Sequence, residues 1–314
     1  MKTFTQIELK KYREEFPITQ KAIFFNHASL GPIPLRSQKE IEKLFTAFYS
    51  PEIIKVDPQA FEAYDKIRGK VAQMINAQLD EVGFCHNTSY GLNIVAGGLD
   101  LKAGDKVLLL DIEFPGNVYP WLNLRKRGVE IEFVPNQNGF FDLDNFLQAI
   151  DEKTKVLSLS FVQFFNGFKN DLESIGKICE EKNIFFVVDA IQGAGVLDLD
   201  VKKCKIDFLS CGGQKWLLSL PGSGFFYLSS QAKAKVEPVF FGWLGCDWHM
   251  DFTDLLKYDL EPFQDMRKFD LGSYPYLAIW TMLPALELLL PTFNSKIRKS
   301  LILLHLIFEI VTTS

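Results

Sequence analysis

Two side chains of this sequence follow apolar segments that are expected to be strands, and the ends of such strands are where binding and reactive groups lie in α/β proteins. Asp189 closes the apolar run 184–188, and Lys215 follows the apolar run 207–211 and two glycines. In an open parallel sheet, ligands bind outside the carboxyl ends of the strands. A lysine among apolar neighbours has a lowered amine pKa, which favours Schiff-base chemistry, and a buried carboxylate keeps a heterocyclic nitrogen protonated. The ordinary alternatives are a helix cap or an ion pair for Asp189 and a solvated charge for Lys215.

Three further places carry groups that a bound planar ligand would use. Thr88 and Ser89 precede a helical stretch, where hydroxyls and free backbone N–H groups form a phosphate site or simply cap the helix. Phe114 follows an expected strand and offers a face for stacking, although a core position is the commoner use of a phenylalanine. Gln192, three residues after the candidate carboxylate, can reach a ring hydroxyl of the same ligand.

Several other kinds of site lack their sequence signals. There is no GxGxxG and no GxxxxGK[ST], the fingerprints of dinucleotide and P-loop sites, and no GxSxG of serine hydrolases. The segment 221–224 (PGSG) is only loosely similar and precedes an expected strand. The four His and five Cys are scattered, with only Cys85 and His86 adjacent, so we expect no metal site.

The middle of the chain alternates short apolar runs with helical stretches such as 172–182. Continuous apolar strands separated by helices are typical of a mostly parallel sheet covered on both faces, an α/β architecture. We expect a helical arm over 1–20, a large domain over 21–270 and a partial small domain over 271–314. The expected strands are 106–111, 129–134, 155–162, 184–189, 207–211 and 224–229.

Composition narrows the class of protein. The chain has 314 residues, 34 basic and 39 acidic side chains and a net charge of −5, which argues against a general nucleic-acid binder. Five cysteines without a CxxC pair fit a reducing compartment. The first residues are charged, and the apolar run 300–311 is too short to span a bilayer of about 30 Å. We therefore expect a soluble cytoplasmic protein with neither a nucleic-acid nor a membrane partner.

Taken in order, the motifs resemble one family, the class V, fold-type I enzymes that depend on pyridoxal phosphate (PLP). This family includes class V aminotransferases, cysteine desulfurases, kynureninase and isopenicillin-epimerase-like proteins. The resemblance implies a mostly parallel, seven-stranded sheet flanked by helices, with a second, smaller domain. The matching motifs are 25–32 (FNHASLGP), 87–93 (NTSYGLN), 113–121 (EFPGNVYPW), 188–193 (VDAIQG), 213–217 (GQKWL) and 267–273 (RKFDLGS).

The resemblance implies roles for the residues around the cofactor ring. Lys215 would form the Schiff base with PLP and carry protons at the substrate Cα. Asp189 would hold the pyridine nitrogen protonated, which makes the ring an electron sink. Gln192 would hydrogen-bond the phenolic oxygen, and Phe114 would stack on the ring.

It also implies contacts to the phosphate and to the substrate. Thr88, Ser89 and Gln214 would bind the phosphate. Ser273 matches a residue that reaches the phosphate of a neighbouring subunit, which implies a homodimer. Asn26 and His27 are candidates for the substrate side.

The implied reaction is PLP-dependent chemistry at the α-carbon of an amino acid, of the class V aminotransferase type. The alternatives are a cysteine desulfurase or selenocysteine lyase and a kynureninase-type lyase. Desulfurases carry a His where Phe114 stands and an Asn near Phe164, so these residues favour the isopenicillin-epimerase-like and kynureninase-like branches.

The end of the chain suggests a third alternative, a truncated homologue with impaired catalysis. The last arginine is Arg298, and the apolar segment 299–314 lacks the usual family continuation. We therefore expect the small domain to be incomplete and to lack the arginine that binds the substrate carboxylate.

Overall fold

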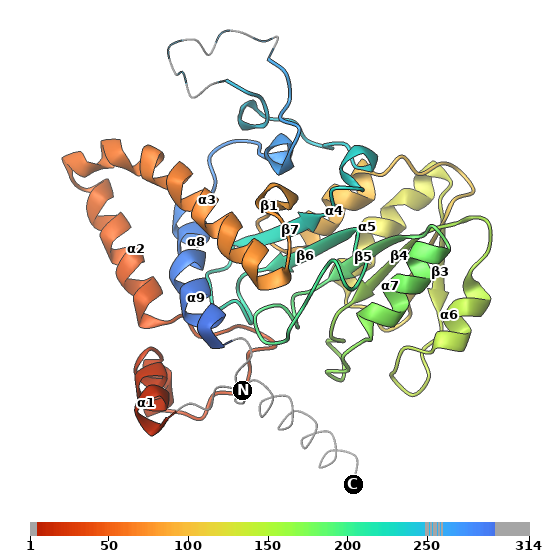
Figure 1. Cartoon of the computed structure of the whole chain (residues 1–314), viewed down its shortest axis with the longest axis horizontal. Coiled ribbons are helices and arrows are strands. Elements are labelled where there is room, and N and C mark those ends of the chain that lie inside the picture. The colour runs from red at the N-terminus through yellow and green to blue at the C-terminus, as the bar shows by residue number, and fades with distance from the viewer. Residues whose placement is uncertain are drawn as a thin grey trace.

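A seven-stranded sheet forms the centre of the protein (Figure 1). The computed structural model describes residues 5–248 and 260–292, together with 251, 253, 256 and 258. Within that part the strand order is β1-β7-β6-β5-β4-β2-β3, and only β7 runs antiparallel to its neighbours. The strands are β1 (Val82–Phe84), β2 (Lys106–Leu110), β3 (Glu130–Val134), β4 (Thr154–Ser160), β5 (Phe185–Asp189), β6 (Phe208–Gly212) and β7 (Gly224–Leu228). The predicted mostly parallel α/β fold is confirmed.

Helices cover both faces of the sheet, as the continuous apolar strands predicted. The α-helices are α1 (Gln6–Glu14), α2 (Leu35–Phe48), α3 (Val56–Ile75), α4 (Thr88–Gly98), α5 (Tyr119–Leu122), α6 (Leu143–Ala149), α7 (Leu172–Glu181), α8 (Tyr276–Trp280) and α9 (Met282–Leu289). Short 3-10 helices lie at Pro17–Gln20, Pro51–Lys55, Leu79–Glu81, Pro115–Asn117, Asn123–Arg127, Lys233–Lys235, Trp243–Gly245, Met266–Phe269 and Leu290–Thr292.

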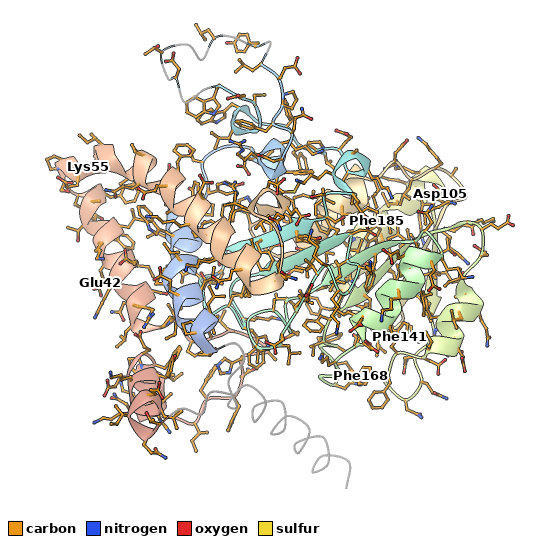
Figure 2. The ribbon with its side chains drawn as sticks, viewed as in Figure 1. Glu42, Lys55, Asp105, Phe141, Phe168 and Phe185 are labelled. Atoms are coloured by element: carbon orange, nitrogen blue, oxygen red, sulfur yellow. The ribbon has the colours of Figure 1, made fainter. Side chains whose placement is uncertain are left out.

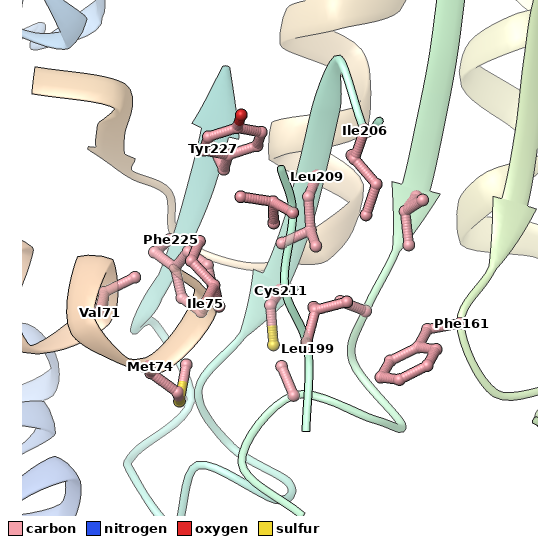
Figure 3. Close-up of a cluster of buried hydrophobic side chains, with 14 of the residues drawn as sticks. Val71, Met74, Ile75, Phe161, Leu199, Ile206, Leu209, Cys211, Phe225 and Tyr227 are labelled. Atoms are coloured by element: carbon pink, nitrogen blue, oxygen red, sulfur yellow. The ribbon is translucent and has the colours of Figure 1, made fainter. Parts of the chain in front are cut away.

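Alternate residues of each strand enter two separate hydrophobic clusters, one on each face of the sheet. In β2, Val107 and Leu109 belong to the cluster under α4 and α5, whereas Leu108 and Leu110 belong to the cluster under α3 and α7. This alternation follows from the two-residue period of a strand. Figure 3 shows the α3 side, where Ile75 lies close to Phe225 of β7. Burial on both faces makes the sheet a rigid platform for the loops at its ends.

The helices α8 and α9 pack onto α2 and α3 at one end of the sheet (Figure 1). Ser37 of α2 donates its hydroxyl to the carbonyl of Thr281, between α8 and α9, at 3.2 Å. Outward-facing charged residues such as Glu42 and Lys55 mark the solvent side of this layer (Figure 2). The division into domains over 21–270 and 271–314 stays a prediction. Residues 293–314, with the apolar run 300–311, lie outside the described residues.

None of the helices in the described ranges combines the length and the apolar character needed to cross a membrane.

Candidate active site

The carboxyl ends of β4, β5 and β6 meet at one edge of the sheet. Asp189 ends β5, with Ser160 of β4 and Ser210 of β6 beside it in register. Because side chains alternate along a strand, Asp189 points to the same face as Val187, the face covered by α4. The strand-end rule therefore placed this carboxylate at the edge where ligands bind parallel sheets.

Asp189 is a buried carboxylate with few partners. It is 3% exposed, and its Oδ1 accepts one hydrogen bond, from the backbone N–H of Ile191 at 3.0 Å. Its Oδ2 has no hydrogen bond within the described part of the chain. Burial raises the pKa of Asp189 to about 7; the nearby Glu113 carboxyl adds to the rise, and the Lys215 charge opposes it. The fold therefore leaves this buried carboxyl without a second partner to offset the cost of its burial.

Lys215 lies in the turn after β6, within electrostatic range of Asp189. Its side chain is half-buried, and burial lowers the pKa of its amine, against the opposing effect of the Asp189 charge. The amine nitrogen lies 5.7 Å from the ring centroid of Phe114. The structure thus brings together a buried carboxylate, a lysine with lowered pKa and an aromatic face.

The N-terminus of α4 is fixed directly beside these groups. The hydroxyl of Ser210 donates to the carbonyl of Thr88 at 2.9 Å, and the N–H of Gly212 donates to the Thr88 hydroxyl at 2.9 Å. Gly91 allows this close approach, since a Cβ there would lie 2.2 Å from the Ser210 hydroxyl oxygen. The side chain of Asn87 caps the amide of Tyr90 at 2.9 Å. The earlier amides of the helix have no partner inside the helix and favour an anion.

A cavity of about 400 Å³ opens next to this helix end. Phe114 is 43% exposed there, and its ring meets the edge of Phe164 at 5.2 Å between centroids. The cavity is lined by Ser89, Asn93, Phe114, Pro115, Gly116, Tyr119, Pro120 and Asn123. The aromatic face predicted from the sequence is therefore accessible and not part of the core.

Glu113 anchors the loop that carries Phe114, a role that the sequence did not reveal. This buried carboxyl accepts hydrogen bonds from the side chains of Asn117 (2.9 Å), Ser160 (2.5 Å) and Gln163 (2.7 Å) and from the backbone of Ser160 (2.9 Å). Burial raises its pKa, against the effect of these donors. The only local signal was a carboxylate directly preceding the aromatic candidate.

Gln192, Gln214 and His27 also lie around the lysine turn. Gln192 bonds to Ala28 and to Trp216, the residue after the lysine. The His27 ring stacks on Trp216, and burial lowers the pKa of His27. The side-chain oxygen of Gln214 is buried and has no partner. This unpaired oxygen lies beside Thr88 and Gly212, whereas buried polar atoms usually have a hydrogen-bond partner.

Two predicted site residues stand apart from this group. Ser273 is exposed, and no hydrogen bond or ring contact among the described residues joins it to the lysine turn. Asn26 is exposed as well, and its carbonyl accepts from the amide of Ser29 at 3.2 Å. Within the described residues, no group of three His, Cys, Asp or Glu side chains is placed to hold a metal ion.

Comparison with known proteins decides the family. Residues 28–299 match the family described as Aminotransferase class-V. The chain belongs to the aminotransferase class-V family. It is 33% identical to a probable cysteine desulfurase of Methanothermobacter thermautotrophicus over 234 residues, which are 73% of this chain and 58% of that protein. A probable cysteine desulfurase of Pyrococcus abyssi is also 33% identical, over 237 residues and 59% of its length. The uncharacterized aminotransferase YcbU of Bacillus subtilis is 25% identical over 283 residues.

Solved structures with the same fold agree with this architecture. The apo cysteine desulfurase from Thermococcus onnurineus NA1 superposes with a TM-score of 0.82 at 24% identity, over 93% of this chain and 72% of that one. The cystine C–S lyase C-DES, in complex with cysteine persulfide, gives 0.79 at 22% identity, over 88% and 74%. At this level of identity the likeness shows the fold.

The family resemblance predicted from the motifs is thus confirmed. The narrower placement in an isopenicillin-epimerase-like or kynureninase-like branch stays a prediction. The chain spans somewhat under three fifths of the length of the two probable desulfurases, so what the whole protein does is a matter for proposal.

Proposed function

We propose that this class-V family chain binds pyridoxal phosphate at the β4–β6 edge and acts at the α-carbon of an amino acid. The observation that carries the proposal is Asp189, a buried carboxylate with one backbone hydrogen bond and an unpaired second oxygen. A protonated ring nitrogen is a partner that fits such a carboxylate. A related fold supports this choice, since a variant of C-DES holds glycine covalently linked to its PLP cofactor.

The residues present fit the parts of this cofactor. Asp189 would pair with the ring nitrogen, and Phe114 would cover one ring face. The hydroxyls and amides of Thr88 and Ser89, at the start of α4, would hold the phosphate, with Gln214 beside them. Gln214 would bind the phosphate with its amide flipped, because the NH2 group then donates to the phosphate from the position of the buried, unpaired oxygen, which can only accept.

When bound, PLP supplies an electron sink for charge that develops at the substrate Cα. The residues of this chain would hold and orient the cofactor and the substrate. Lys215, with its lowered amine pKa, would hold the cofactor and then take or give the proton at Cα. Gln192 would donate an N–H to the phenolic oxygen. Asn26 and His27 would face the substrate. Phe114 and Phe164 would shield one side of the bound ring from water.

Cleavage of the C–S bond of cysteine is the second candidate, because two relatives at 33% identity are named probable cysteine desulfurases. Product analysis separates the two. A keto acid indicates amino-group transfer, whereas alanine with released sulfur indicates desulfuration. PLP binding without turnover would identify the impaired homologue.

A homodimer in the cytoplasm is part of the proposal. The exposed Ser273 would then reach the phosphate in the partner subunit. Sedimentation of the PLP-loaded chain measures the dimer directly.

The experiment that tests the proposal is Lys215→Ala in the full chain with added PLP. After removal of unbound PLP, and with no amino acid present, we expect the wild type to keep a visible absorption band that Lys215→Ala lacks. In deuterated water with an added amino acid, we expect only the wild type to catalyse proton exchange at Cα. Lys177→Ala is the matched control, since Lys177 is exposed and paired with Glu173 on α7 at 2.9 Å. A wild type that carries no such band after unbound PLP has been removed by gel filtration overturns the proposal.

A further inference from the structure

Trp216 is the residue directly after the candidate lysine, and it begins a chain of hydrogen bonds. Its indole N–H donates to Oε1 of Gln192 at 3.1 Å. The amide nitrogen of Gln192 donates in turn to the carbonyl of Ala28 at 3.0 Å. The chain of bonds joins the lysine turn, the loop after β5 and the segment 26–31.

Donor and acceptor chemistry fixes which way the Gln192 amide points. An indole N–H only donates, and a backbone carbonyl only accepts. A flipped amide would set its NH2 against the Trp216 N–H and its oxygen against the Ala28 carbonyl, so both contacts would be lost. The observed orientation leaves one N–H of Gln192 available for a further acceptor.

The ring of Trp216 also holds segment 26–31 in place. It stacks on His27 with 5.0 Å between centroids and 13° between planes. The amide of Gly31 donates to the carbonyl of Gln214 at 2.8 Å, and a Cβ at Gly31 would lie 2.0 Å from the Lys215 carbonyl oxygen. Only glycine permits this contact. Segment 26–31 is thereby tied to the lysine turn at two points.

We propose that Trp216 is a positioning residue that acts through Gln192. It orients the amide so that an N–H, and not the oxygen, is presented to an acceptor oxygen of the bound ligand. This inference rests on the proposed PLP site, where the acceptor is the phenolic oxygen. Trp216 acts through this amide in the proposal, so its effect depends on the amide being present.

A double-mutant cycle tests this dependence. The dissociation constant of PLP is measured by titrating the apoprotein of the wild type, Trp216→Phe, Gln192→Leu and the double variant. Phenylalanine keeps a ring against His27 and removes the N–H. We expect Trp216→Phe to weaken PLP binding about three- to tenfold in the wild-type background, and to have no more than a twofold effect when Gln192 is already Leu. Trp121→Phe is the matched control, since this buried indole N–H has no hydrogen-bond partner.

A second variant tests the orientation without altering Trp216. Gln192→Glu keeps an oxygen for the indole N–H but sets a carboxylate oxygen toward the ligand. We therefore expect Gln192→Glu to bind PLP more weakly than Gln192→Leu. Equal losses from Trp216→Phe in both backgrounds, or tighter binding by Gln192→Glu than by Gln192→Leu, would overturn the inference. If the wild type itself binds no PLP, the proposed function falls first and this inference falls with it.

Discussion

Two buried aspartates of this protein differ in how their charge is balanced. Asp270 is 7% exposed and accepts from the Arg68 guanidinium at 2.9 Å and from the hydroxyl of Tyr274. Asp189 is 3% exposed and accepts a single backbone hydrogen bond. Burial raises the pKa of both carboxyls, and only Asp270 has a guanidinium in direct contact to oppose it.

This difference distinguishes Asp270, a structural carboxylate, from Asp189, a carboxylate available to a ligand. Asp270 completes its bonding within the chain and ties the segment before α8 to α3. Asp189 faces Lys215 only at a distance, since no ion pair joins these two residues. An unbalanced buried charge costs folding free energy, so a fold that retains one at the end of a strand, near a lysine with a lowered pKa, points to a binding function.

The largest expected effect comes from breaking the structural pair. Arg68→Met leaves Asp270 buried without its cation, and we expect a loss of about 3–5 kcal/mol in the free energy of unfolding. Urea unfolding of the apoprotein measures it. Adding Asp270→Asn to Arg68→Met should recover part of the loss, because the uncompensated charge is then gone. No recovery would mean that Asp270 does not carry the cost.

The site aspartate should respond in the opposite way. Asp189→Asn keeps the shape of the side chain, removes the charge and cannot hold a ring nitrogen protonated. We expect Cα proton exchange to fall by about 100- to 1000-fold, with the free energy of unfolding of the apoprotein at pH 7 unchanged or raised. Unfolding curves and exchange rates are measured on the same preparations. A destabilisation as large as that of Arg68→Met would place Asp189 among the structural carboxylates instead.

The apolar strand runs predicted much of the sheet, and the strand-end rule predicted part of the site. Six of the seven strands in the described structure coincide with predicted runs, because buried strands of a parallel sheet are continuous in hydrophobicity. The three-residue strand Val82–Phe84 was missed. It is too short to carry a pattern, and its pairing with β7 decides it. Asp189, Thr88 and Lys215 could be chosen as candidates because each lies at or just after a strand end or at a helix start; their roles stay predictions.

The contacts that orient the site could not be predicted from the sequence. Glu113 bonds to Ser160 and Gln163, which lie 47 and 50 positions further along the chain. The indole N–H of Trp216 meets an amide 24 positions earlier. Neither partner leaves a local periodicity or composition signal. Such contacts arise when strands far apart in sequence become neighbours in the sheet.

The last expected effect is the pH dependence of stability by which the wild type differs from Asp189→Asn. In the unfolded chain an aspartate titrates near pH 3.9, whereas burial raises the folded-state pKa of Asp189 to about 7. Between these pH values the folded apoprotein holds the extra proton, so stability from this group is full below about pH 4 and is lost as the pH rises to 7. We expect the stability of the wild type, relative to Asp189→Asn, to fall by about 3 kcal/mol from pH 4 to pH 7. Groups shared by both proteins cancel in this difference, and Asp144→Asn, at an exposed carboxyl, controls for loss of one charge.

Bound PLP should abolish this pH dependence of stability, because a ring nitrogen that pairs with Asp189 keeps the carboxyl ionised between pH 4 and pH 7. A slope of the same sign and size with PLP bound would mean that the ligand does not meet this carboxylate.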